Sequence, residues 1–201
     1  VASLRLRVGG ERLPLPLART LAGQCMGLWN MYGPTETTVW SSVERIEAGA
    51  NAVSLGQPIA RTRLYVLDAQ RRPALPHAIG EIWIGGAGVA DGYLHRPDLT
   101  AERFVTDPFA ADGSRMYRTG DLGRWRTDGS IEYLGRNDFQ AKIRGFRIEL
   151  GEIEARLLEH EAVGAAVVLA RPDRSGDLQI GAYYVPAAGQ GTVSVETFRA
   201  H

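Results

Sequence analysis

The sequence predicts a mixed α/β and α+β fold in which two domains follow each other along the chain. Glycine is frequent, with 24 residues in clusters, which indicates many tight turns. Short apolar segments fill the middle of the chain, and a helical pattern between strands follows them. The chain has 201 residues, 44% of them apolar, which is enough for one compact domain or two small ones.

The N-terminal part predicts a strand, a helix and a second strand. Residues 4–8 alternate in polarity and end at two glycines, which predicts a strand and a turn. Residues 15–25 are expected to form a short helix. Residues 28–32 predict a strand that stops at Gly33 and Pro34, because both residue types interrupt regular structure.

The middle part predicts a small, twisted, largely antiparallel sheet or barrel. Its strands are expected at residues 64–67, 81–84, 124–126 and 131–134. Asp128–Gly129 separates the last two of these strands. This dipeptide predicts a hairpin with a type I′ turn, because that turn needs positive φ at both central residues.

The C-terminal part predicts a second α+β layer. Residues 142–150 are expected to form a charged strand pair interrupted at Gly145. A helix is expected at residues 151–161, with Ile153, Leu157 and Leu158 on one face. Two strands with a polar turn between them are expected at residues 165–170 and 178–185, and the start of another helix at residues 193–201. The change of character places a domain junction near Asp138. One domain is therefore expected over residues 1–137 and the second over residues 138–201.

Composition excludes several classes of protein. Lysine plus arginine equals aspartate plus glutamate at 23 each, so no basic field points to nucleic acid or an anionic membrane as the main partner. The single cysteine, Cys25, rules out an internal disulfide framework and a four-cysteine zinc site, and we interpret it as a small apolar residue. No apolar run is long enough to span a bilayer, so the expected location is the cytoplasm.

The most informative segment is Asn30–Thr38 (NMYGPTETT). A turn after a strand exposes backbone N–H groups and a threonine hydroxyl that suit a phosphate, and Glu36 suits a hard cation such as Mg²⁺. The alternative is an ordinary helix N-terminus, with Thr35 as cap and Glu36 in the first turn. Considered locally, Thr119–Gly120–Asp121 is also simply a turn, and Gly145 fits a β-bulge as well as a functional loop.

Four ordered segments together resemble one family. Asn30–Glu36 resembles the N-x-Y-G-P-T-E signature of adenylate-forming enzymes, in the form used by adenylation domains of nonribosomal peptide synthetases. Gly80–Val105 is similar to the G-E-L-x-I-G-G-x-G-L-A-x-G-Y motif and its R-P-x-L-T continuation. Tyr117–Asp121 matches Y-R-T-G-D, and Tyr133–Glu154 matches G-R-x-D-x-Q-x-K-I-R-G-x-R-I-E-L-G-E-I-E at nearly every position. The resemblance extends from about Leu4 to the end of the chain.

The resemblance implies a fold and a reaction. Residues 1–137 would be the C-terminal part of the large AMP-binding domain, including its distorted β-barrel subdomain, and residues 138–201 the hinge and an incomplete small α+β domain. The enzyme would activate an amino acid with ATP and Mg²⁺ to an aminoacyl-AMP, and then transfer it to the phosphopantetheine thiol of a peptidyl carrier protein domain. A condensation domain in the same megaenzyme is a further implied partner.

The same resemblance implies roles for individual residues in the nucleotide site. The residues that would bind the nucleotide are Asn30, Tyr32, Gly33, Thr35, Asp121 and Arg136. Thr35 would contact the α-phosphate, and Tyr32 would stack on adenine. Asp121 would accept hydrogen bonds from both ribose hydroxyls, which suits a carboxylate with two acceptor oxygens, while Arg136 would approach the ribose or the phosphates. Glu36 would bind Mg²⁺ and, with Thr35 and Lys142, form the catalytic set.

Other implied roles concern the hinge and the substrate pocket. Asp138 corresponds to the hinge, and Gly145 to the loop that approaches the pantetheine arm in the thioester step. The amino-acid pocket would be lined by Gly9, Met31, Val39 and Trp40. The bulk of Trp40 would favour a small side chain such as that of glycine, and a methionine beside a valine would also suit threonine; ordinary core positions are the alternative for residues 39 and 40.

Two family segments are not found in the sequence: the Gly-, Ser- and Thr-rich phosphate loop with its lysine, and the lysine near the family's C-terminus. Because the chain also lacks an initiator methionine, we expect a fragment that has no useful adenylation activity alone. Two alternatives stay open. One is an acyl-CoA or aryl-acid ligase of the same superfamily, and the other is a non-catalytic truncated module.

Overall fold

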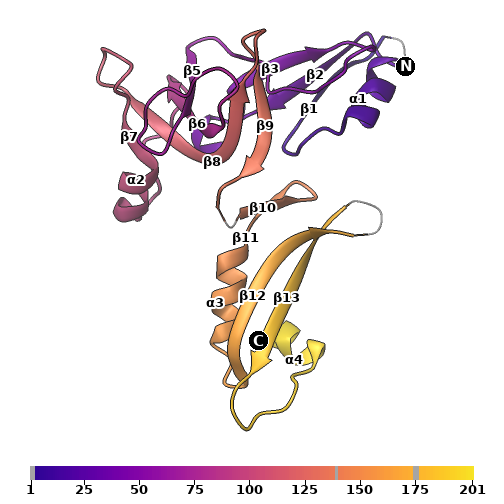
Figure 1. Cartoon of the computed structure of the whole chain (residues 1–201), viewed down its shortest axis with the longest axis vertical. Coiled ribbons are helices and arrows are strands. Elements are labelled where there is room, and N and C mark those ends of the chain that lie inside the picture. The colour runs from indigo at the N-terminus through magenta and orange to yellow at the C-terminus, as the bar shows by residue number, and fades with distance from the viewer. Residues whose placement is uncertain (1–2, 139, 174–176) are drawn as a thin grey trace. The chain divides into compact units, whose positions relative to one another are not determined.

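The structure, a computed structural model, describes residues 3–138, 140–173 and 177–201 (Figure 1). It divides into two compact units, Val1–Asp138 and Phe139–His201. The first unit holds two sheets with short helices, and the second holds two strand pairs with two helices. This content agrees with the predicted mixed α/β class. None of the helices within the described ranges is both long and apolar enough to cross a membrane.

The first sheet of the N-terminal unit has four strands in sequential order. They are β1 (Arg5–Gly9), β2 (Gly27–Tyr32), β3 (Ser42–Ile46) and β4 (Gln57–Pro58). Strands β1 and β2 are parallel, joined by helix α1 (Leu15–Ala22), and the other pairs are antiparallel. Ala18 of α1 and Leu28 of β2 are fully buried in one hydrophobic cluster, which anchors the helix on the sheet. The helix stops at Gly23, earlier than the predicted residue 25.

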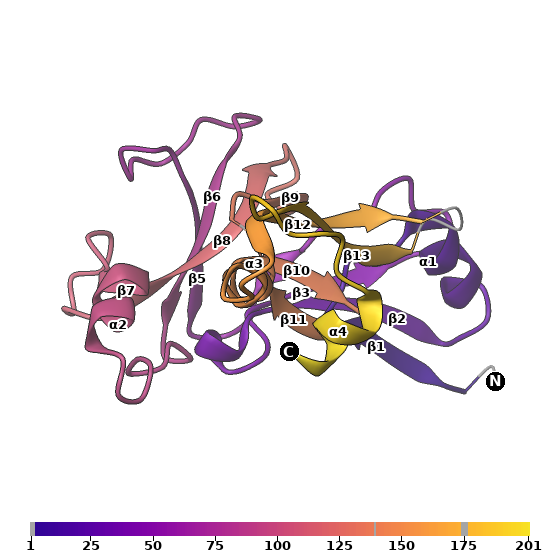
Figure 2. The same ribbon diagram turned by 90° about the horizontal axis from the view of Figure 1, so that it is seen from below.

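The second sheet is antiparallel. Its strands are β5 (Thr62–Leu67), β6 (Gly80–Gly86), β7 (Phe104–Thr106), β8 (Arg115–Trp125) and β9 (Ile131–Arg136). The order is β5-β6-β8-β7, with β9 also paired to β8, and α2 (Pro97–Arg103) lies beside β7 (Figures 1 and 2). Strand β8 is the longest of the sheet and carries both Tyr117 and Asp121, so one strand holds the whole Y-R-T-G-D motif.

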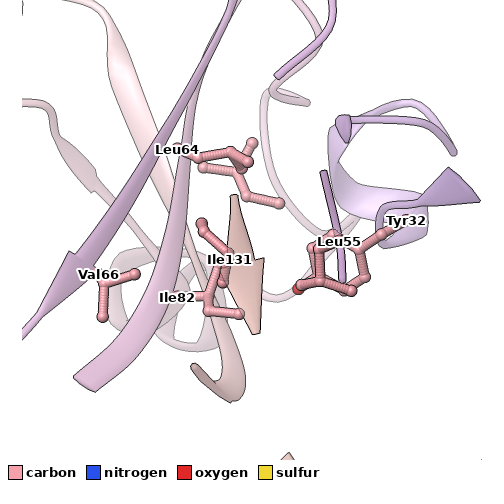
Figure 3. Packing of buried hydrophobic residues seen from close by; sticks show 7 residues of the cluster. Tyr32, Leu55, Leu64, Val66, Ile82 and Ile131 are labelled. Atoms are coloured by element: carbon pink, nitrogen blue, oxygen red, sulfur yellow. The ribbon is translucent and has the colours of Figure 1, made fainter. Parts of the chain in front are cut away.

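A cluster of buried side chains joins the two sheets of the first unit (Figure 3). Its members come from β2, β5, β6 and β9 and from the segment before β4: Tyr32, Leu55, Leu64, Val66, Ile82, Ile84 and Ile131. Tyr32 is the member whose polar tip leaves the cluster, because its hydroxyl bonds a carboxylate on β8. The core therefore positions the end of β2 against the second sheet.

The C-terminal unit contains two antiparallel strand pairs. Its elements are β10 (Gln140–Ile143), β11 (Phe146–Glu149), α3 (Leu150–Leu158), β12 (Val163–Pro172), β13 (Leu178–Pro186) and α4 (Val195–Ala200). Ile153 and Leu157 of α3 pack against the buried cluster that contains Val168 of β12. Contrary to the prediction, Leu158 does not share this face and is 46% exposed, because a residue five positions after Ile153 points about 140° away around the helix.

The structure contradicts one predicted turn type and one alternative interpretation of a glycine. Of Asp128 and Gly129, only the glycine has positive φ (76°), so the predicted type I′ turn is wrong there. The Asp128 carboxylate instead accepts hydrogen bonds from the backbone N–H and hydroxyl of Ser130, which holds a longer turn. Arg144 (φ 52°) and Gly145 (φ 79°) are both left-handed between β10 and β11. Since this pair shows no register shift, the β-bulge alternative for Gly145 is also wrong.

Candidate functional site

A buried carboxylate on β8 lies at the centre of the site. The hydroxyl of Tyr32 donates to Oδ2 of Asp121 over 2.6 Å, and Nη1 of Arg136 donates to Oδ1 over 2.6 Å. The backbone N–H of Asp121 donates to Oγ1 of Thr119. Residues that lie 89 and 15 positions from Asp121 in the sequence thus meet on its two oxygens.

The protonation of this group is well defined. Burial and the negative charge of Asp121 raise the pKa of Tyr32 well above its ordinary value, so the phenol remains a neutral donor. Burial lowers the pKa of Arg136, but its hydrogen bonds to Asp138 and the charge of Asp121 outweigh this effect and raise it overall. Burial and Asp121 likewise raise the pKa of Tyr133.

Arg136 also connects Asp121 to the last residue of the first unit. Its Nε and Nη2 atoms donate to Oδ1 and Oδ2 of Asp138, both over 2.8 Å, in a two-pronged pair. Arg103 approaches Asp138 at 3.7 Å. Gly120 has φ 76°, and a Cβ added there would lie 2.3 Å from Oδ2 of Asp138. The residue between Thr119 and Asp121 must therefore be glycine for this pair to form.

The segment with Thr35 and Glu36 forms a single turn, the 3₁₀ helix η1 (Thr35–Thr37), after Pro34. Pro34 rather than Thr35 occupies the cap position, so the alternative with Thr35 as helix cap is wrong. The side chain of Thr35 is exposed, whereas Glu36 is only 7% exposed. The backbone N–H of Ala90 donates to the carbonyl of Glu36 over 2.9 Å, which attaches this turn to the segment after β6.

Two tyrosines that the sequence analysis did not select hold Glu36. Oε1 of Glu36 accepts from the hydroxyls of Tyr93 (2.7 Å) and Tyr117 (2.8 Å). Both tyrosines belong to segments of the family resemblance, but nothing in the local sequence of either links it to Glu36.

A magnesium ion suits Glu36 only in the company of a nucleotide. In the parts of the chain that the structure describes, no three His, Cys, Asp or Glu side chains are grouped as a metal site. Mg²⁺ in nucleotide sites is commonly held by one or two carboxylates together with substrate phosphates and water. A single well-held carboxylate therefore fits this kind of magnesium.

The side chains of Asn30 and Tyr32 are largely buried and make contacts within the fold. The Asn30 amide is buried and donates to the carbonyl of Ser54 over 2.6 Å. Tyr32 is 8% exposed and its ring belongs to the cluster of Figure 3, so little of the ring is accessible for stacking. Gly33 permits a close approach of the chain, since a Cβ there would lie 2.6 Å from the carbonyl oxygen of Val39.

The residues expected in the amino-acid pocket are grouped at the ends of β1 and β2. A Cβ on Gly9 would lie 2.5 Å from Cζ3 of Trp40 and 2.5 Å from the carbonyl oxygen of Met31, so these three residues are in contact. Val39 is exposed, with φ 70°, and the N–H of Trp40 donates to the carbonyl of Thr38 over 2.8 Å. This is a γ-turn with positive central φ, a strained form that is rare for a β-branched residue. Such strain is commonly found at functional sites.

Lys142 and Gly145 lie in the second unit. Lys142 is on β10 and pairs across the strands with Arg147, and Gly145 is at the turn of the same hairpin. The hairpin therefore presents several cationic side chains around a left-handed turn.

The sequence is similar to those of known proteins. A family model described as AMP-binding enzyme matches residues 1–94. The chain is 50% identical over 196 residues to a dimodular nonribosomal peptide synthase of Bacillus subtilis, and 46% identical over 187 residues to tyrocidine synthase 3 of Brevibacillus parabrevis. The alignments cover 97% and 90% of this chain. The chain belongs to the AMP-binding family, in its nonribosomal peptide synthetase branch.

Solved structures agree with this membership of the AMP-binding family. A four-domain nonribosomal peptide synthetase bound to AMP and glycine shares 47% identity with a TM-score of 0.65, and covers 98% of this chain. An artificially fused adenylation–PCP di-domain from Klebsiella oxytoca shares 32% identity with a TM-score of 0.79, also over 98% of this chain. The chain spans only 8% and 3% of the two synthetases above, and 14% and 37% of these two structures.

Proposed function

We propose that this chain is part of an adenylation domain that activates an amino acid with ATP and transfers it to a carrier-protein thiol. The observation that carries the proposal is the convergence of the separate motifs in the first unit. Direct hydrogen bonds join Tyr32 to Asp121, Asp121 to Arg136, and Glu36 to Tyr117. The convergence is what a single nucleotide site requires of segments so far apart in the sequence.

In the first half-reaction the amino acid carboxylate attacks the α-phosphate of ATP, and pyrophosphate leaves. Asp121 binds the ribose hydroxyls, and the neutral Tyr32 and the charged Arg136 hold its carboxylate in place. The exposed hydroxyl of Thr35 is available to the α-phosphate. Glu36 would hold Mg²⁺, which would supply positive charge against the negative charge that develops on the phosphates. No side chain forms a covalent bond, so the residues act by positioning and electrostatics.

The contact of Trp40 with Gly9 supports a small amino acid as substrate. The indole ring occupies the space directly above the glycine, where a Cβ has no room. A ring at this place would shorten an amino-acid pocket formed at the ends of β1 and β2. Glycine is our first candidate and threonine the second, with Met31 contributing to the same wall.

The second unit supports the thioester half-reaction. The phosphopantetheine thiol of a carrier protein attacks the acyl adenylate, and AMP leaves. Lys142 and the left-handed Gly145 lie on the hairpin that we assign to this step, and Asp138, at the boundary of the two units, is the proposed hinge. A carrier domain is the partner that this reaction requires, and a condensation domain in the same megaenzyme would use the thioester that it forms.

The test begins with the reading frame on both sides of this sequence. A synthetase predicts a Gly-rich Ser/Thr-Lys loop upstream, and a catalytic lysine and a carrier-domain serine downstream. The protein encoded by the complete frame should then catalyse ATP–pyrophosphate exchange that depends on an amino acid, with glycine tested first, whereas the 201-residue chain alone should not. Exchange that depends on an aryl acid or fatty acid instead would favour the acyl-CoA or aryl-acid ligase. Absence of exchange with any acid would favour a non-catalytic module.

A further inference from the structure

Glu36 is held from the side of the second sheet by two phenols. Tyr117 is on β8 and fully buried, and Tyr93 lies in the segment between β6 and α2. Their hydroxyls are 3.3 Å apart and both donate to Oε1 of Glu36. The two tyrosines are 57 and 81 positions from Glu36, so the tertiary fold creates this arrangement.

The two phenol rings are themselves fixed. Phe104 of β7 packs against both, with ring centroids 5.3 Å from Tyr93 and 5.0 Å from Tyr117. The backbone N–H of Tyr93 donates to Oγ1 of Thr100 on α2 over 2.9 Å. Because the rings cannot move freely, their hydroxyls define where Oε1 of Glu36 lies and which way the carboxylate plane turns.

We propose that Tyr93 and Tyr117 are positioning residues for Glu36 and that they set the Mg²⁺ affinity of the site. The inference rests on the proposed function, in which Glu36 is a magnesium ligand. A carboxylate held by fixed donors loses less freedom when it binds a cation. Hydrogen-bond partners of metal-ligating groups typically change metal affinity 10–100-fold when they are removed.

The test uses Tyr93→Phe and Tyr117→Phe in the protein encoded by the complete reading frame. Titration calorimetry without amino acid measures ATP binding as a function of Mg²⁺ concentration, so the readout does not depend on turnover. Each variant should raise the Mg²⁺ concentration for half-maximal binding about tenfold. The control is Tyr65→Phe, which removes a phenol–carboxylate bond to Asp107 (2.9 Å) on the same sheet and should leave the Mg²⁺ requirement unchanged.

Glu36→Gln separates the two hypotheses. If Glu36→Gln does not alter the Mg²⁺ requirement, the magnesium role in the proposed function is wrong. If Glu36→Gln raises it but both tyrosine variants behave like Tyr65→Phe, the positioning role is overturned while the proposed function stands. Adding Tyr117→Phe to Glu36→Gln should give no further increase, because the tyrosine acts through Glu36. A further increase as large as that in the single variant would point to general disruption and overturn the inference.

Discussion

Replacing Arg136 by methionine removes the cation that Asp121 and Asp138 share, while keeping an unbranched side chain. The side chains of Arg136 and Asp121 are 11% and 4% exposed and their charged atoms are 2.6 Å apart. Removing one partner of a buried ion pair costs about 3–5 kcal/mol, because the other charge is left uncompensated. Asp121 keeps the Tyr32 hydroxyl, so we expect the lower end of this range, about 3 kcal/mol.

Arg124→Met is the matched control on the same pair of strands. Arg124 bonds Glu132 at 2.8 Å, but both side chains are more than a third exposed, at 39% and 38%. An exposed pair of this kind contributes about 0–1 kcal/mol. The same chemical change in the same hairpin should therefore leave the free energy of unfolding nearly unchanged. The difference between the two variants in this free energy measures the effect of burying the ion pair.

The assay is urea unfolding followed by tryptophan fluorescence. The chain has four tryptophans, and all lie in the unit that contains Arg136: Trp29, Trp40, Trp83 and Trp125. Adding Asp121→Asn to Arg136→Met should recover part of the lost stability, because it removes one of the two carboxylate charges that lose Arg136, while Asp138 still has Arg103 at 3.7 Å. Equal losses in Arg136→Met and Arg124→Met, or no recovery in the double variant, would refute the reasoning.

Three further predictions concern single side chains. Because the folded state raises the pKa of Tyr32, the stability that its neutral hydroxyl contributes is complete below about pH 10 and is lost as the pH rises further. The free energy of unfolding of Tyr32→Phe should therefore depend less on pH above that value than the free energy of unfolding of the unchanged chain, and an equal pH dependence would contradict this. Gly9→Ala places a Cβ 2.5 Å from the Trp40 ring and should cost about 1–3 kcal/mol in urea unfolding, together with a shifted Trp40 emission; an unaltered midpoint would show that the ring yields freely. Gly151→Ala meets no atom within 4 Å in helix α3 and should stabilise the second unit by about 0.4–1 kcal/mol in far-UV circular dichroism melts, so a lower melting temperature would contradict the helix assignment.

Local patterns predicted most elements of this fold. The strand at 28–32 and the helix after residue 150 follow from polarity and periodicity, and the structure has both with ends shifted by a few residues. The turn at Asp128 was mispredicted because two turn types accept the same dipeptide. The choice between them depended on the hydrogen bonds of the Asp128 side chain to Ser130.

Local sequence patterns do not predict which distant segments of the chain contact each other. The family resemblance selected Tyr32, Glu36 and Asp121, but it did not indicate that the hydroxyl of Tyr32 bonds Asp121 or that Tyr117 bonds Glu36. Such pairs are created by strand order: β8 lies beside β6 and β9, and this arrangement follows from the packing of the whole sheet. Sequence reasoning therefore selected candidate residues, and the structure supplied the hydrogen-bond partners of these residues.

The separate hydrophobic clusters have a consequence for how genes of this family can recombine. Each described cluster draws all its members from one side of residue 139: three from the first unit and one, around Val168, from the second. After a crossover between codons 138 and 139, all side chains of each of these clusters would still come from the same parent gene. Exchange at this point would transmit the segment with Trp40 and Gly9 intact, while the hairpin with Lys142 came from another parent.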